Sequence, residues 1–266
     1  MDSIRLYLKY VGISINSQLQ YRASLIMQII GHFLITIIEF FAIWALFARF
    51  GTLRGWTLPE IAVFYGMISI SFAISQSFGR GFDMFSLQVN SGDFDRTLLR
   101  PRTTVLQVLA QDFQLTKSGR LLQGLLILIW AAVHLGIGWT FPKVMLLLFA
   151  VFGGIMLFTG LIILQATMCF WSTQSLEIIN CFTDGGVETA QWPISIYDRW
   201  FVKIFTFIIP LACVNYYPVI AILGRNAVLN SPVWFRWVSP LIGVIFLLVS
   251  IRIWAFGVKH YRSTGS

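Results

Sequence analysis

A run of 27 residues without a charged side chain, Val144–Phe170, constrains the fold of this chain more than any other feature. A helix that crosses a bilayer needs about 20 consecutive apolar residues, and this run exceeds that length. Of the 266 residues, 57% are hydrophobic and 11% are charged, whereas soluble domains carry about 25% charged residues. So few charges cannot cover a water-facing surface. The composition excludes an ordinary soluble enzyme, a disordered chain and a coiled coil, and it predicts an all-α integral membrane protein.

Six stretches are apolar enough to span a membrane, which predicts one membrane domain over residues 1–266. The expected spans are Ala23–Phe47, Ile61–Phe78, Leu121–Gly138, Val144–Phe170, Phe201–Val219 and Val238–Phe256. Two prolines interrupt the fifth of these stretches. Before the first span, apolar residues of Met1–Arg22 recur at helical spacing on one face, and no signal-peptide pattern is present. We expect an amphipathic interface helix there, with an ordinary lead-in to the first span as the alternative.

Basic residues are unevenly distributed between the expected loops. With the N-terminus in the cytoplasm, 14 of the 19 Lys and Arg residues fall on the cytoplasmic side and 5 on the outer side. Such a bias is typical of membrane proteins, and it predicts that both termini are cytoplasmic. It also explains the net charge of +8, so no nucleic-acid partner is expected.

Two connections stand out from the expected spans. The stretch 80–120, on the cytoplasmic side, is the only long hydrophilic loop and carries 10 of the 30 charges. The stretch 210–236, on the outer side, alternates apolar pieces with helix breakers and includes Pro210, Asn215, Tyr216, Tyr217 and Pro218. We expect short re-entrant helices in this outer segment, because irregular backbone at membrane depth requires protein or water around it.

The first span carries a polar seam. Gln28, His32, Thr36 and Glu39 are spaced by four, four and three residues, which places them on one helix face. The seam is interpreted as part of a translocation path, as an interhelical hydrogen-bond network, or as a proton relay through the two titratable side chains.

Several kinds of chemistry have no sequence support. The chain has no phosphate-binding G-x-x-x-x-G-K-[ST] loop, no H-E-x-x-H zinc motif and no G-x-S-x-G elbow. Cys169, Cys181 and Cys213 are widely spaced and fit free apolar cysteines better than a disulfide or metal site. We expect no catalytic residue, metal or cofactor in this chain. Energy for any transport then comes from another chain or from an ion gradient.

The cytoplasmic loop contains a short amphipathic helix. Phe82, Phe85 and Val89 recur at spacings of three and four, and Asn90-Ser91-Gly92 then breaks the pattern. An aromatic-faced helix of this kind can dock in a groove of a soluble partner, and the alternative is a helix resting on lipid headgroups. The residues expected to contact such a partner are Phe82, Asp83, Phe85, Val89, Gly92, Asp93, Asp95, Arg96, Leu99 and Arg100.

Three sequence pieces resemble the permease subunits of ABC-2 type ATP-binding cassette (ABC) exporters, in a less characterised bacterial branch. These are GDFDRTLLRP at Gly92–Pro101, WPISIY at Trp192–Tyr197 and IIPLACVNYYP at Ile208–Pro218. The chain departs from the pattern at Trp192, where Tyr is commoner, and Glu39 has no counterpart in it. With the six-span layout, the likeness covers nearly the whole chain.

The resemblance implies an interface helix at Met1–Arg22, an ATPase-coupling helix at Phe82–Leu99 and outer re-entrant helices at Pro210–Arg236. It implies that two separate cytoplasmic ATPase subunits bind ATP and Mg²⁺ and hydrolyse the ATP. It also implies a second six-span permease, more often a different chain than a second copy, in the bacterial cytoplasmic membrane.

The resulting expectation is an exporter permease in contact with membrane lipid. Its cargo would be amphiphilic: a lipid, a lipid-linked molecule, a peptide or a drug. The alternative is a secondary transporter or channel that uses Gln28, His32 and Glu39 with an ion gradient. A non-transporting membrane scaffold has no positive support in the sequence.

Overall fold

A computed structural model describes residues 3–171, 176–227 and 231–261, and its regular structure is helical throughout these ranges. The only extended pairing there is an isolated bridge between Leu53 and Trp56. The long helices are α1 (Ser3–Gln20), α2 (Arg22–Phe50), α3 (Leu58–Asp83), α7 (Ser118–His134), α8 (Phe141–Met168), α9 (Leu176–Ala190) and α14 (Leu241–His260). The shorter ones are α4 (Phe85–Asn90), α5 (Asp93–Leu98), α6 (Thr104–Leu109), η1 (Leu115–Lys117), η2 (Ile194–Ile196), α10 (Arg199–Phe207), α11 (Leu211–Val214), α12 (Tyr216–Leu223) and α13 (Val233–Val238).

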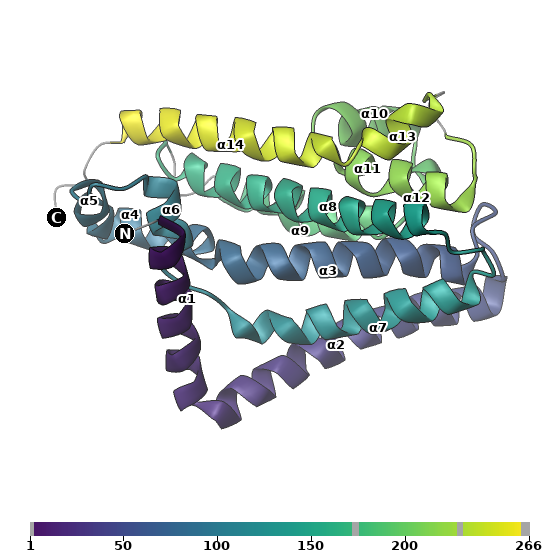
Figure 1. The fold of residues 1–266 in the computed structure, drawn as a ribbon, viewed down its shortest axis with the longest axis horizontal. Helices are drawn as coiled ribbons and strands as arrows, with labels where there is room; N and C mark the ends of the chain where they lie inside the picture. The colour runs from purple at the N-terminus through teal and green to yellow at the C-terminus, as the bar shows by residue number, and fades with distance from the viewer. Residues whose placement is uncertain (1–2, 172–175, 228–230, 262–266) are drawn as a thin grey trace.

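Figure 1 shows a bundle of long helices with shorter helices at both ends. Helices α2, α3, α7, α8 and α14 run lengthwise, and α9 lies behind α8 and α3. Helix α1 crosses one end of the bundle, where α4, α5 and α6 also lie, and we call this the α1 end. Helices α10 to α13 gather at the opposite end, which we call the α12 end.

Helix α3 is the centre of the bundle. Every residue from 61 to 73 is buried, because α7, α8 and α9 pack around this helix. Helix α2 contacts mainly α7 and exposes most of its apolar side chains. A helix that is apolar all round and exposed on most of its surface needs an apolar environment, which the bilayer supplies.

Small residues bring neighbouring helices into backbone contact. A side-chain carbon on Gly243 of α14 would run into the carbonyl oxygen of Gly153 on α8. On the other side of the bundle, a carbon on Gly124 of α7 would lie 3.0 Å from Ser69 Cβ of α3. Close packing at small residues is a main source of helix association in lipid, where the hydrophobic effect contributes little between helices.

Four helices within the described residues are long and apolar enough to cross a membrane, or five if one bent pair is counted. The four are Arg22–Phe50, Leu58–Asn90, Phe141–Met168 and Leu241–His260. They overlap the first, second, fourth and sixth expected spans. The expected third span corresponds to α7, which is a 17-residue helix.

The expected fifth span, Phe201–Val219, is broken at the first of the two prolines that were expected to interrupt it. Helix α10 and the pair α11–α12 are bent by 75° at a break between Phe207 and Leu211. Pro210 lies at this break, where it supplies no backbone N–H and cannot continue the helix. The apolar run is therefore sharply bent at the α12 end.

The loop Trp192–Tyr197 lies at the α12 end. Six spans that begin in the cytoplasm would put this connection, between the fourth and the fifth span, on the same side as the N-terminus. Trp56, just before α3, donates from its indole Nε1 to Ser195 Oγ at 3.0 Å. Helix α9 runs lengthwise between the two ends of the bundle. Arg199 and Lys203 belong to α10, which follows this loop at the α12 end.

Candidate functional site

A buried aromatic cluster holds α4 and α5 against the ends of α8 and α14. Phe85 of α4 has its ring centroid 4.7 Å from that of Trp254 and 4.9 Å from that of Phe94 on α5. Trp254 is fully buried and donates from Nε1 to Thr104 Oγ1 at 2.9 Å. We define the aromatic cluster as Phe82, Phe85, Phe94, Phe170, Trp254 and Tyr261, all joined by ring contacts.

Two glycines determine the course of the chain before and between α4 and α5. Gly81 lies so close to the Val108 carbonyl that a side-chain carbon at this position would overlap it, which brings α3 against α6. Gly92 has a φ of 76°, the left-handed conformation that L residues rarely adopt, and it starts α5. The chain can therefore turn sharply between α4 and α5 and place Phe85 and Phe94 in the same cluster.

Burial changes the expected roles of the coupling residues. Phe82, Phe85 and Val89 are at most 5% exposed, so they contact this chain's own helices and present no surface to a partner. The sequence assigned them to a docking face because the amphipathic pattern does not say which partner covers the apolar side. The helix α14 covers it here.

The outward side of the segment carries different side chains. Leu99 is 87% exposed and Leu87 is 57% exposed. Arg96 pairs with Asp93 at 3.6 Å across one turn, and Ser91 Oγ donates to Asp93 Oδ2 at 2.8 Å. We define the exposed tip as Leu87, Asp93, Arg96, Leu98, Leu99 and Arg100, all exposed. Asp95 is half-buried beside it.

Helix α1 is attached to the end of the same loop. Phe113 N donates to Ser14 Oγ at 3.1 Å, and Leu115 N donates to Gln18 Oε1 at 3.0 Å. Gln18 Nε2 also donates to the Phe113 carbonyl. Gln114 N in turn donates to the Ser77 carbonyl of α3 at 3.0 Å. The loop 113–115 therefore joins the interface helix to the central helix.

The polar seam of α2 meets α3 and α7 at two of its four residues. Thr36 is buried, and its carbonyl accepts from Tyr65 Oη at 2.9 Å and from Gln123 Nε2 at 3.3 Å. Glu39 Oε2 accepts from the same Tyr65 hydroxyl at 3.3 Å. These contacts are interhelical hydrogen bonds of the kind that hold bundles together.

The other two seam residues lie apart from this network. Gln28 is exposed and donates to Ser24 Oγ at 3.1 Å, one turn earlier on the same helix. His32 is half-buried, and within the described residues no hydrogen bond joins it to Glu39.

Charged side chains line a cavity between α3, α8 and α9. The cavity, of about 150 Å³, is lined by Arg80 and Asp83 of α3 and by Asp184 of α9. Lys117 lies just before α7, and burial together with the nearby Arg120 lowers the pKa of its ammonium group. Asp83, expected at the partner-facing surface, therefore lies in this cavity.

At the α12 end, the expected re-entrant residues are all buried. Asn215 donates from its amide to the Ala190 carbonyl at the end of α9, and Tyr217 packs on Phe235 with 5.2 Å between ring centroids. Pro210, Tyr216 and Pro218 surround them in the same core. The segment is therefore part of the protein core and not a loose surface loop.

At the α12 end, an ion pair joins α3 to the segment that follows α12. Arg225, after α12, contacts Glu60 of α3 at 2.8 Å and lies 4.3 Å from the ring centroid of Trp56. Arg225 also donates to the Gly55 carbonyl at 2.9 Å. Glu60 accepts from Thr57 N in a capping box. Since Trp56 also holds Ser195, this group links α3 to α12 and to the loop after α9.

Sequence patterns do not identify the distant residues that these sites bring together, although some of them mark the residues involved. Thr57-x-x-Glu60 is a capping-box pattern at the start of a span. Ser14 and Gln18 are one helical turn apart, and Trp254 and Tyr261 are two turns apart. Each pattern indicates a shared face, but none of them identifies the distant segment that the face contacts.

Comparison with known proteins decides the family. The profile of the ABC-2 family transporter proteins matches residues 33–265. This chain belongs to that family. No curated protein and no solved structure gave a significant match. Membership makes the chain a multi-pass membrane protein and a permease component of an ABC transporter.

Membership in the ABC-2 family also bears on the catalytic and nucleotide-binding motifs that the sequence lacks. Permeases of this family generally work with cytoplasmic ATPase subunits and do not themselves bind cofactors. Within the described parts of this permease, no three His, Cys, Asp or Glu side chains gather as metal ligands.

Proposed function

We propose that this ABC-2 protein is the permease of an ATP-driven exporter and that α4 and α5 receive the movement of two cytoplasmic ATPase subunits. The ATPases would bind ATP and Mg²⁺, and the α1 end, with both termini, would face the cytoplasm of a bacterium. The observation that carries this proposal is the aromatic cluster, because it fixes an exposed tip to two membrane helices. A force on Leu99 or Arg96 would reach α8 and α14 through the rings of Phe85 and Trp254.

Six crossings are proposed, made by α2, α3, α7, α8, α9 and α14. Helices α7 and α9 have 17 and 15 residues, and at 1.5 Å per residue they rise about 26 and 23 Å. Both fall short of the about 30 Å hydrocarbon core, which local thinning of the bilayer accommodates at modest cost. In this arrangement α10 to α13 form the re-entrant segment on the outer side.

A second six-span permease, different from this chain, is proposed to complete the path. The exposed apolar surface of α2 and the charged cavity beside α9 support a position for the partner along α2, α3 and α9. The cargo proposed is amphiphilic. Rigid-body rotation of the two permeases would open the path.

Co-purification tests the coupling role. The permease is expressed with the ATPase encoded beside it, and the amount of ATPase retained on the tagged permease is measured. We expect Leu99→Asp and Arg96→Glu to lower ATPase retention several-fold, because both side chains lie on the exposed tip. Arg252→Glu, a charge reversal on an exposed residue of α14, is the matched control and should leave retention unchanged. Equal retention by all three variants would contradict the proposal.

A further inference from the structure

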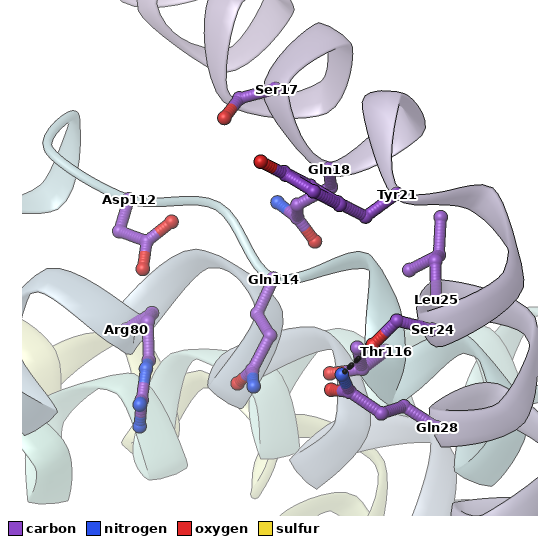
Figure 2. Close-up of a pocket in the computed structure, with 10 residues that line it drawn as sticks. All are labelled: Ser17, Gln18, Tyr21, Ser24, Leu25, Gln28, Arg80, Asp112, Gln114 and Thr116. Atoms are coloured by element: carbon purple, nitrogen blue, oxygen red, sulfur yellow. Dashed lines mark hydrogen bonds between the residues drawn. The ribbon is translucent and has the colours of Figure 1, made fainter.

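A pocket of about 400 Å³ lies where α1, α2, α3 and the 112–116 loop meet, at the α1 end. We propose that this pocket binds the headgroup of a phospholipid that carries both a phosphate and a primary amine. Figure 2 shows Asp112 and Arg80 on one side of the pocket and Ser24 and Gln28 on the other. The inference concerns lipid recognition and is independent of ATP coupling.

The wall of the pocket is mostly polar. Its lining includes the hydroxyl groups of Ser17, Ser24 and Thr116 and the amides of Gln18, Gln28 and Gln114. Leu25 is the one aliphatic residue among the ten that line it. Half of the lining residues are exposed, so the pocket is open to its surroundings. Its donors and acceptors favour a polar ligand over an apolar one.

Two buried polar atoms in this wall have no partner within the described residues. Thr116 is 5% exposed, and its hydroxyl Oγ1 makes no hydrogen bond. The amide oxygen Oε1 of Gln114 is also buried without a hydrogen bond. Unsatisfied buried groups of this kind are rare in native proteins, and a polar ligand would satisfy both.

The two charged residues set the chemistry of the ligand. Arg80 lines this pocket and also the cavity that holds Asp83 and Asp184. No carboxylate lies within salt-bridge distance of its guanidinium in the part of the chain that the structure describes, so it can bind a phosphate as well. Asp112 uses one carboxylate oxygen, Oδ1, to accept from Ser14 Oγ at 3.1 Å. Among the described residues no hydrogen bond engages its second oxygen, which can accept from an ammonium group. A headgroup with a phosphate and a primary amine matches this pair, whereas a glycerol headgroup has no cation for Asp112.

The position of the pocket favours a lipid over a soluble phosphate ester. Helix α1 crosses the end of the membrane helices (Figure 1). In the proposed orientation an amphipathic helix at this end lies at the depth of the headgroups. Next to the pocket residues Leu25 and Gln28 on α2, Ile26 and Met27 are 55% and 72% exposed. Acyl chains can lie along these side chains while the headgroup occupies the pocket.

Native mass spectrometry of the purified protein tests this assignment. The protein is titrated with phosphatidylethanolamine, phosphatidylcholine or phosphatidylglycerol, and the dissociation constant of the first bound lipid is measured. We expect phosphatidylethanolamine to bind at least about tenfold more tightly than the other two, because only its ammonium brings Asp112 a positively charged hydrogen-bond donor. Asp112→Asn should remove this preference, and Arg80→Gln should weaken the binding of all three lipids, since all three carry the phosphate. Arg252→Gln, at an exposed position on α14, should change neither the affinity nor the preference.

Two results would overturn the proposal. The first is equal affinity for the three lipids in the wild type, an unchanged preference in Asp112→Asn, or an unchanged affinity for phosphatidylethanolamine in Arg80→Gln, each in protein that elutes and unfolds like the wild type. Should either variant fail to fold, Gln114→Leu replaces it, and an unchanged affinity for phosphatidylethanolamine in that variant counts equally. The second is tight binding of glycerophosphoethanolamine without acyl chains, which would identify the ligand as a soluble ester.

Discussion

Trp254 of α14 contacts Phe85 of α4 with 4.7 Å between ring centroids and 63° between ring planes. The two residues are 169 positions apart in the chain, and both are fully buried. Edge-to-face aromatic pairs are favourable beyond the area that they bury, and they restrict the orientation of both rings. The short helix α4 is therefore held to the last membrane helix as one unit.

Replacing Trp254 by alanine tests this unit. We expect Trp254→Ala to lower the free energy of unfolding by about 3–5 kcal/mol, because it leaves a cavity among four aromatic rings. Hydrogen exchange of α4 and α5 should rise with it. The control is Trp200→Ala, because Trp200 is 63% exposed and its removal should change stability little. Unchanged exchange in α4 after Trp254→Ala would show that the cluster does not anchor the segment.

The contact between α8 and α14 depends on Gly243. We expect Gly243→Val to destabilise the protein by about 2 kcal/mol or more, since the new side chain would overlap the Gly153 backbone and separate the helices. Thermal unfolding in detergent measures the effect. Gly31→Ala on α2 is the matched control, because an added carbon there meets no atom within 4 Å. An equal loss in both variants would indicate a general cost of replacing membrane glycines.

The ion pair between Glu60 and Arg225 is suited to a double-mutant cycle. Glu60→Gln can still accept from Thr57 N, so the comparison isolates the charge interaction with Arg225. We expect a coupling energy of about 1–2 kcal/mol between Glu60→Gln and Arg225→Gln, since Glu60 is mostly buried and Arg225 is partly exposed. A coupling energy near zero would mean that α12 is held at this end by the apolar contacts of its neighbours.

Substitution of Glu39 tests whether the polar seam of α2 is structural or belongs to a transport path. We expect Glu39→Gln to leave transport and stability nearly unchanged, because the amide oxygen can still accept from the Tyr65 hydroxyl. Tyr65→Phe removes the donor to Glu39 and to the Thr36 carbonyl, and it should cost about 1 kcal/mol of stability. Measurement of transport in proteoliposomes, with assembly checked by gel filtration, decides the matter. A strong loss of transport in correctly assembled Glu39→Gln protein would instead indicate that the polar seam is part of a translocation path or a proton relay.

The sequence predicted the helices best where the bilayer is the main partner. The expected spans Ala23–Phe47 and Val144–Phe170 lie within a few residues of α2 and α8, because lipid-facing helices are apolar over their whole length. The search for long apolar runs did not find helix α9. It carries Glu177, Asp184 and Glu188, and its average apolarity is too low for a lone span.

The candidate sites were harder to predict than the spans. Phe82 and Phe85 lie on an apolar face, as expected, but the sequence pattern does not distinguish a partner protein from Trp254 of the same chain. A contact between residues 169 positions apart is set by the tertiary fold. Leu99, in contrast, is 87% exposed and accessible to another protein, and its contact with a partner stays a prediction.

Site-directed cross-linking at Leu99 tests the central claim most directly. Cysteines 169, 181 and 213 are replaced by serine or alanine, and a photoactivatable probe is attached to Leu99→Cys in the complex with the ATPase. We predict a cross-link to the ATPase from this position, and none from Leu122→Cys, which is 52% exposed on α7. If Leu99→Cys forms no cross-link in an assembled complex, or if Leu122→Cys forms an equal one, the exposed tip is not the ATPase contact.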